Sequence, residues 1–280
     1  DTVESSWLLD TDLRDVVLWG DHLLVSRFRT AEVLEVSATG TLLNRVKPPQ
    51  VTTYESIFKQ GPVERHLSAT TAWRMLPLPS GEALLLHQRA LDDLTVRSKG
   101  VYTGRLCGSG VVAPALTLVG GSGSVPRVSI GATLGGRLIL DVAVSGNGQR
   151  FALIEAAGSA AERPAGVPYP SIWAIERSQL QPAAGCGTGS IVVGLRTWNE
   201  APIAGAYDSK DQLWIQTDAA TVYRVSEQTP HAIALRDAEP VDGAARRLFH
   251  IADGVQTNCV LCHPEATDDA HVWNFVDFGL

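Results

Sequence analysis

The sequence predicts a mainly β protein, a β-propeller of four to seven blades followed by a short α-helical segment. Short apolar runs joined by tight turns recur along most of the chain. Segments with the period of a helix are almost absent before residue 240, and prolines spread from Pro48 to Pro170 interrupt any long helix. Beyond about residue 238 this strand pattern is lost, so we place a domain boundary there.

Residues 16–43 show the repeating unit most clearly, because "GDH", "FRT" and "SATG" separate four short apolar runs. Residues 203–235 repeat this pattern around "SKD", "TDAA" and "EQTP". A four-stranded unit that recurs every roughly 40–60 residues is typical of a β-propeller. The sequence contains four such units, at about 13–47, 67–118, 138–194 and 203–236.

The connections between these units are long for a propeller, at 48–66, 119–137 and 157–170. A fifth blade can be assembled from them together with residues 5–11. A β-sandwich would also give evenly spaced strands, but the number of strands is too high for one sandwich. We therefore expect a propeller over residues 1–238 and a different, helical segment over 239–280.

The composition and net charge indicate which classes of binding partner to expect. With 45% hydrophobic and 19% charged residues in a chain of 280, the protein has the make-up of a soluble globular domain. A net charge of −7 gives no basic surface, so nucleic acid is not an expected partner. No run approaches 18 apolar residues, so we expect no membrane span. The chain begins at Asp1 rather than Met, which we interpret as processing or trimming.

The C-terminal segment contains the most specific motif. Ala244, Leu248 and Ile251 fall on one helical face, and C-x-x-C-H follows at Cys259, Cys262 and His263. In such a motif two thiols add to the vinyl groups of haem and the histidine becomes an axial iron ligand. A zinc site would need two more ligands, and a thioredoxin-type redox pair would need a βαβ context, so the motif favours one covalent haem c.

"RRLFHIADGVQTNCVLCHPEATDDAHVWNF", residues 246–275, resembles the start of a bacterial di-haem cytochrome c peroxidase domain of the MauG-like group. The body resembles the propeller that precedes such domains in some exported bacterial proteins. The resemblance implies a cytochrome c-like segment with two haems, each on its own C-x-x-C-H. Only the first motif is present here. We therefore expect either a fragment of a longer chain or a reduced form with one haem.

The resemblance also suggests a sixth iron ligand. A distal histidine can stand directly before a tryptophan in this family, and His271 and Trp273 fit that pattern in "HVW". His250 is the second candidate and Met75, the only methionine, is the third. A solvated loop histidine at His271 and a core-edge histidine at His250 remain the alternatives. Trp273 either packs on the porphyrin or relays electrons, and we favour packing.

Several other residues carry weaker expectations. Asp268 and Asp269 bond a propionate partner or cap a turn. Cys107 and Cys186 both lie in Gly-rich turns, which favours a disulfide between them over two separate buried thiols. A disulfide and a covalent haem both indicate a periplasmic or extracellular protein. We expect "HQR", residues 87–89, to be a solvated turn, with a position lining a propeller face as the alternative.

These observations lead to three functional hypotheses. The first is a c-type haem electron-transfer protein whose haem lies beside a propeller and serves a redox partner protein. The second is part of a di-haem peroxidase or MauG-like oxidase whose second haem domain lies outside this chain. The third is a binding propeller with a metal-clipped tail. In the first case we expect little peroxidase activity from this chain alone.

Overall fold

The structure is a computed structural model that is mainly β, as the sequence predicts. It describes residues 2–57, 61–93, 95–96, 111–121, 123, 125–129, 132–134, 139–155, 171–180, 190–194, 202–218, 220–225, 231–235, 249, 259–273 and 275–276. Within these ranges, no helix has the length and apolar character needed to cross a membrane.

The first sheet is a four-stranded antiparallel meander in the order β1-β2-β3-β4. Its strands are β1 (Leu13–Trp19), β2 (His22–Arg27), β3 (Val33–Ser37) and β4 (Leu42–Val46). Gly20 closes the first hairpin with a φ of 62°, a left-handed conformation that glycine adopts without steric cost. This sheet matches the first predicted unit, including its turns at "GDH", "FRT" and "SATG".

The second sheet has six strands, with the main order β10-β9-β7-β6-β5 and β11 paired to β9. Its strands are β5 (Val51–Ile57), β6 (Gly61–Pro77), β7 (Ala83–Leu91), β9 (Val112–Gly120), β10 (Arg127–Val128) and β11 (Ala132–Thr133). The first half of β6 pairs with β5 and the second half with β7. The connections expected at 48–66 and 119–137 therefore contain strands, but these strands extend the second sheet and do not form a fifth blade, and residues 5–11 form no strand.

The third and fourth sheets are again four-stranded antiparallel meanders. The third comprises β12 (Ile139–Val144), β13 (Arg150–Glu155), β14 (Ser171–Glu176) and β15 (Ser190–Gly194). The fourth comprises β16 (Pro202–Tyr207), β17 (Leu213–Thr217), β18 (Thr221–Arg224) and β19 (His231–Ala234). Both sheets coincide with predicted units, and four separate sheets of four or more strands rule out a single two-sheet sandwich.

The remaining elements are short. A 3-10 turn, η2 (Arg177–Gln179), follows β14. Near the C-terminus are the helical turn α2 (Cys259–Cys262), the 3-10 turn η3 (Pro264–Ala266) and β20 (Phe275–Val276). β20 pairs in parallel with β8 (Thr95–Val96), which ties residues 275–276 to the segment that follows β7. The boundary expected near residue 238 and most of the expected helix lie outside the described residues, although Phe249 has helical conformation.

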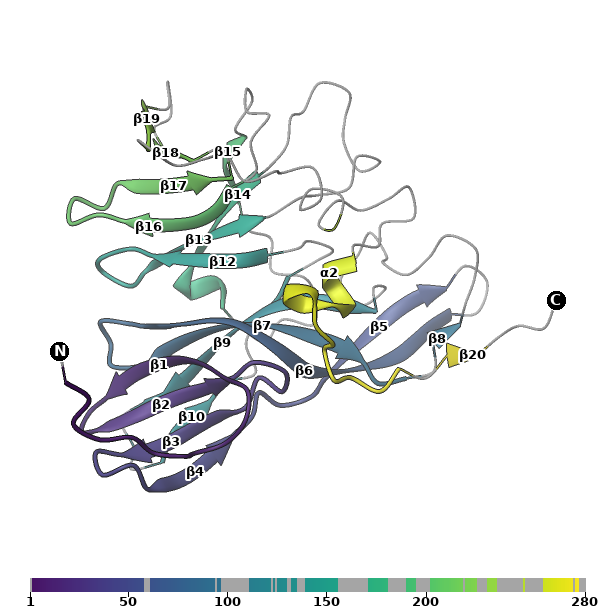
Figure 1. The fold of residues 1–280 in the computed structure, drawn as a ribbon. Helices are drawn as coiled ribbons and strands as arrows, with labels where there is room; N and C mark the ends of the chain where they lie inside the picture. The colour runs from purple at the N-terminus through teal and green to yellow at the C-terminus, as the bar shows by residue number, and fades with distance from the viewer. Residues whose placement is uncertain are drawn as a thin grey trace.

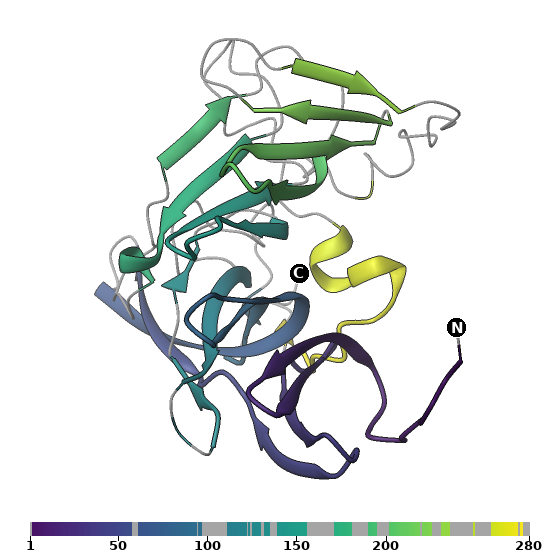
Figure 2. The ribbon, with the colours of Figure 1, turned by 90° about the vertical axis from the view of Figure 1, so that its left-hand side faces the viewer.

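The sheets follow one another in chain order along an open arc (Figures 1 and 2). Neighbouring sheets contact each other chiefly through β1, β6, β12 and β16, the first strand of a meander in three of the four sheets. Among the described strands the first and fourth sheets do not adjoin (Figure 2). The C-terminal segment with α2 lies on the open side of the arc, between these two sheets in this view.

Carboxylates join the sheets along these strands. Asp15 Oδ2 on β1 accepts a hydrogen bond from the backbone N–H of Met75 on β6, at 2.7 Å. Asp141 Oδ2 on β12 accepts one from Gly205 on β16, at 3.1 Å. A Cβ at Gly205 would lie 2.8 Å from Cδ1 of Ile154 and 2.9 Å from Cδ1 of Ile215, so a larger residue here would require these buried side chains to shift.

Two large apolar clusters fill the spaces between sheets. One lies between the first and second sheets and includes Val17, Trp19, Met75, Leu85 and Val119. The other combines the second and third sheets, the C-terminal segment and one turn of the first sheet, and it includes Phe28, Trp73, Leu86, Leu116, Phe151, Val260 and Leu261. The C-terminal segment therefore shares a core with the body.

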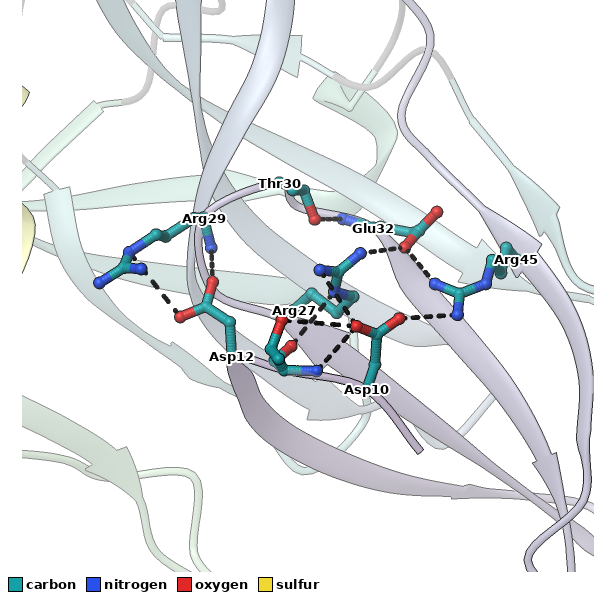
Figure 3. A network of polar contacts seen from close by, with 8 residues as sticks. Asp10, Asp12, Arg27, Arg29, Thr30, Glu32 and Arg45 are labelled. Atoms are coloured by element: carbon teal, nitrogen blue, oxygen red, sulfur yellow. Dashed lines mark hydrogen bonds and ion pairs between the residues drawn. The ribbon is translucent and has the colours of Figure 1, made fainter. Parts of the chain in front are cut away.

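A ring of charges fastens the segment before β1 to the first sheet (Figure 3). Arg45 Nη2 lies 2.6 Å from Asp10 Oδ2, and Arg45 Nη1 lies 2.9 Å from Glu32 Oε2. Arg27 closes the ring through Glu32 Oε2, at 2.8 Å, and Asp10 Oδ1, at 3.3 Å. Each charged group thus has two partners of opposite sign, and the hydrogen bond from Arg45 is the largest cause of the lowered pKa of Asp10.

Candidate functional site

The C-x-x-C-H motif forms a single helical turn. The backbone N–H of His263 donates to the carbonyl of Cys259 at 2.9 Å, which closes the turn. Residues three apart share a helix face, so Cys259 and Cys262 lie on the same side of the turn, and His263 follows directly with a non-helical backbone (φ −120°, ψ 62°). On the other side, Val260 and Leu261 are 1% and 7% exposed and belong to the core shared with the body.

The two thiols have different surroundings. Both cysteines are free thiols, with Cys259 exposed and Cys262 half-buried. Burial, assisted by the negative charge of Asp269, raises the pKa of Cys262 to about 11. A thioredoxin-type pair needs a thiol whose pKa is lowered, so this environment disfavours that alternative. A turn with two free thiols on one face suits addition to the two vinyl groups of a haem.

His263 is oriented by a backbone carbonyl. Its Nδ1 lies 3.1 Å from the carbonyl oxygen of Thr267, and since a carbonyl can only accept, Nδ1 carries the proton. In the neutral ring, Nε2 is then the nitrogen with a free lone pair. Histidines that ligate metals usually donate their other ring N–H to a carbonyl or carboxylate in this way. His263 is exposed, so Nε2 is accessible to a ligand outside the fold.

The loop after His263 is closed by local hydrogen bonds. Thr267 Oγ1 donates to the carbonyl of Pro264 at 2.7 Å. Asp268 Oδ1 accepts from the N–H of Ala270 at 2.5 Å, and Asp269 Oδ1 accepts from the N–H of His271 at 3.0 Å. Both acids therefore cap a turn, one of the two roles expected for them. Burial is the main cause of the raised pKa of Asp269.

His271 and Trp273 lie next to each other on the body. The His271 ring meets the Trp273 ring edge-on, with 4.6 Å between centroids and 78° between planes. His271 Nε2 lies 3.0 Å from the carbonyl oxygen of Leu91 at the end of β7, so Nε2 carries a proton and donates. Trp273 is partly buried against the shared core. Ligation of iron by His271 Nε2 would require the hydrogen bond to Leu91 to break.

The other predicted site residues lie elsewhere. Met75 is 2% exposed in the cluster between the first and second sheets, which does not include the motif turn. His250, Cys107 and Cys186 lie outside the described residues. The structure thus brings together Cys259, Cys262 and His263, places His271 and Trp273 on the same segment, and keeps Met75 apart.

The donor set at the turn, two thiols and one imidazole, is the set that attachment of haem c requires. In the described part of the chain no three His, Cys, Asp or Glu side chains are grouped as metal ligands. A covalently attached haem needs only the two thiols and His263 from this turn. Phe249 and Trp273, partly buried against the shared core, supply apolar surface on the same segment of the chain.

Three consecutive polar residues on β7 are buried, which the sequence analysis did not predict. His87, Gln88 and Arg89 are at most 2% exposed, so the expected solvated turn at 87–89 is wrong. His87 Nδ1 donates to the carbonyl of Gln88, and Nε2 lies 2.9 Å from Thr117 Oγ1. Burial, then the charge of Arg89, lowers the pKa of His87 to about 3. The absence of any turn-forming residue in "ALLLHQRAL" was the available signal of an unbroken strand.

Comparisons with known proteins reveal no family for this chain. No protein-family model and no curated protein sequence matches it. Similar solved structures include a protein of unknown function from Bacteroides thetaiotaomicron (9% identity, TM-score 0.43, covering 79% of this chain and 42% of that one). Others are a luciferin-regenerating enzyme (12%, 0.43, 82% and 64%) and the β-propeller domain of Cps50 (Swd1) from Myceliophteria thermophila (11%, 0.32, 84% and 70%).

This chain spans less than two thirds of the length of the first two of these structures. Similarity at such identities and TM-scores carries no conclusion about what this chain binds or catalyses.

Proposed function

We propose that this protein is a c-type haem electron-transfer protein, with one haem covalently held at Cys259 and Cys262. The observation that carries the proposal is the geometry of the motif turn. Cys259 and His263 are exposed on either side of the half-buried Cys262, while Val260 and Leu261 hold the turn in the core. The Nδ1–H bond to Thr267 leaves Nε2 of His263 available as the axial ligand.

The chain's own residues would hold the group as follows. Cys259 and Cys262 form the thioethers, and His263 binds one side of the iron, where the bound haem supplies one-electron chemistry. His271 is our first candidate for the opposite side, and His250 is the second. For His271 to become an iron ligand, the hydrogen bond from its Nε2 to the Leu91 carbonyl must break and Nε2 must turn to the iron.

In this proposal the body is a β-propeller in which the four described sheets are blades. Its strands provide the apolar core on which the motif turn is built, and its surface would receive a redox partner protein or a second haem domain. A covalent haem requires maturation outside the reducing cytosol, so we propose a periplasmic or extracellular location.

Covalent haem attachment tests the proposal directly. The chain should be produced in a bacterial periplasm with the haem-attachment machinery, and its intact mass and pyridine haemochrome spectrum measured. We expect the mass of one haem and a type-c spectrum, both lost in the Cys259→Ala/Cys262→Ala double variant. The Cys107→Ala/Cys186→Ala double variant serves as the matched cysteine control and should retain the haem. A wild-type chain that matures without covalent haem would overturn the proposal.

Ligand state then separates electron transfer from peroxide chemistry. A six-coordinate haem should give a low-spin ferric spectrum, a reversible one-electron titration and little turnover of hydrogen peroxide. His271→Ala should move the ferric spectrum toward high spin and allow cyanide to bind. Strong peroxide turnover by the unmodified chain would instead favour the peroxidase alternative.

A further inference from the structure

We propose that Arg14, on the first strand of the body, is a positioning residue for His263. This inference rests on the proposed function, in which His263 binds the haem iron. Arg14 does not touch His263. It acts through Glu265, which lies in the turn that carries the hydrogen-bond acceptor of the His263 ring.

The turn between His263 and Thr267 has an unfavourable backbone. Glu265 and Ala266 have φ values of 50° and 59°, so two successive non-glycine residues are in the left-handed region. Such conformations persist only where the surroundings enforce them. The turn ends at Thr267, whose carbonyl oxygen accepts the proton on His263 Nδ1. The orientation of the imidazole therefore depends on a strained turn being held in place.

Arg14 supplies a restraint from the body. Arg14 Nη1 lies 2.6 Å from Glu265 Oε1, with side-chain exposures of 32% and 47%. The guanidinium carbon also lies 5.0 Å from the centroid of the Phe28 ring, within the range of a cation–π contact. Phe28 in turn meets Trp73 edge-on and belongs to the same core as Val260 and Leu261.

The contact with Phe28 consequently restricts the position of the Arg14 guanidinium. Its guanidinium rests on a buried aromatic ring, which limits its motion more than that of a solvated surface arginine. An arginine held in this way fixes the carboxylate of Glu265, and with it the turn from Pro264 to Thr267. The motif turn is thus anchored twice, by Val260 and Leu261 before His263 and by Glu265 after it.

The tautomer of His263 reports this restraint without any haem. In the full chain produced haem-free, nitrogen-15 NMR at a pH well above the usual pKa of histidine should show a dominant Nδ1–H tautomer at His263. We expect Arg14→Gln and Glu265→Gln each to lose that dominance, and the double variant to add nothing further. Arg14→Lys, which keeps the charge, should retain it.

Arg150→Gln is the matched control, because it removes another ion pair, with 3.2 Å between Arg150 Nε and Glu176 Oε1, far from the motif in sequence. It should leave the His263 tautomer unchanged. Glu265→Gln removes the same pair from the loop side, so the test stands even if Arg14→Gln perturbs folding through Phe28. An unchanged tautomer in Glu265→Gln, or an equal change in Arg150→Gln, would overturn the role of Arg14.

Haem-loaded chains provide the second arm. The reduction potential should shift in Arg14→Gln and Glu265→Gln and stay constant in Arg150→Gln, because the hydrogen bond to an axial histidine tunes the iron. A constant potential in both motif-side variants would overturn the positioning role in the loaded protein. A chain that never attaches haem would refute the proposed function instead, while the tautomer measurement still decides whether Arg14 orients His263.

Discussion

The second sheet and the C-terminal segment share one core but are held in different ways. In β7 every residue is buried, and the strand is paired along its length with β6 and β9. Residues 259–273 contain only a four-residue helical turn and a 3-10 turn. They meet the body through apolar contacts of Val260, Leu261 and Trp273, through the Arg14–Glu265 pair and through the bond from His271 to Leu91.

The two regions should therefore contribute differently to stability. A side chain in β7 packs within a sheet that is hydrogen-bonded on both sides, so truncating it should lower the free energy of global unfolding. A contact of the C-terminal segment supports a short piece of chain, which can open while the sheets stay folded.

Truncation in β7 should give the largest effect. Leu86 is fully buried in the shared core, so Leu86→Ala should lower the free energy of unfolding by about 2–5 kcal/mol. Leu18→Ala, at a side chain that is 72% exposed, should change it by no more than about 0.5 kcal/mol. Urea unfolding of both variants checks the comparison. A loss below about 1 kcal/mol for Leu86→Ala would show that the second sheet is not the rigid part.

The buried histidine of β7 should make the body sensitive to acid. His87 stays neutral in the fold with a pKa of about 3, whereas its ordinary pKa is 6.5. The unfolded chain thus binds the extra proton, and stability present above pH 6.5 is lost as the pH falls toward 3. Between pH 6.5 and about 4.5 this group alone should remove roughly 2–3 kcal/mol.

His87→Gln should flatten that part of the pH profile, whatever it does to stability at neutral pH. The measurement is the urea midpoint of both chains across this range. His66, whose pKa is raised chiefly by its hydrogen bond to Asp93, contributes with the opposite sign but is common to both chains and cancels in the difference. Parallel profiles for the two chains would mean that His87 is not held neutral.

The sequence predicted the body well because its information is local. Turn residues at "GDH", "SGNG" and "SKD" mark hairpins whose strands are neighbours in the chain, so the first, third and fourth predicted units coincide with sheets, whereas the second covers only the middle of the six-stranded sheet. The β5–β6 hairpin was missed because proline and charged residues made 48–66 read as a loop. The burial of His87 depends on packing against other strands, which no local pattern reveals.

The site was predictable to the same extent. Spacing alone grouped Cys259, Cys262 and His263, because one helical turn brings those positions together. The bond from His271 to the Leu91 carbonyl joins residues 180 apart in the sequence. The pair between Arg14 and Glu265 likewise joins opposite ends of the chain. Contacts of this kind follow from how the sheets are arranged, and the sequence pattern did not contain them.

Weakening the apolar contacts of Leu261 should allow residues 259–273 to open more easily while the sheets stay folded. Leu261 is 7% exposed, and Leu261→Ala should lower the free energy of local opening of residues 259–273 by about 2 kcal/mol. Hydrogen exchange should then quicken in this segment while exchange in β7 stays slow. Val272→Ala, at a 79% exposed side chain, is the control and should change neither region. Equal acceleration in both regions would show that the segment and sheet open together.

The smallest effect should come from the charge ring of the first sheet. Glu32 bonds both Arg27 and Arg45, so Glu32→Gln weakens two pairs at once (Figure 3). Partly exposed pairs of this kind contribute little, and we expect the melting temperature to fall by roughly 2–4 °C at most. The exposed Glu4 provides a matched control through Glu4→Gln, which should leave it unchanged.

Salt and acid should distinguish this ring from packing. High salt screens exposed charges, so it should shrink the difference in melting temperature between the wild type and Glu32→Gln, whereas the difference caused by Leu86→Ala persists.

Since Arg45 lowers the pKa of Asp10, the stabilisation from that carboxylate is lost as the pH falls through its lowered value, below 3.8. Asp10→Asn should remove this acid-side loss. A melting-temperature difference for Glu32→Gln that does not depend on salt would show that the ring stabilises the protein through packing, as β7 does, and not through exposed charges.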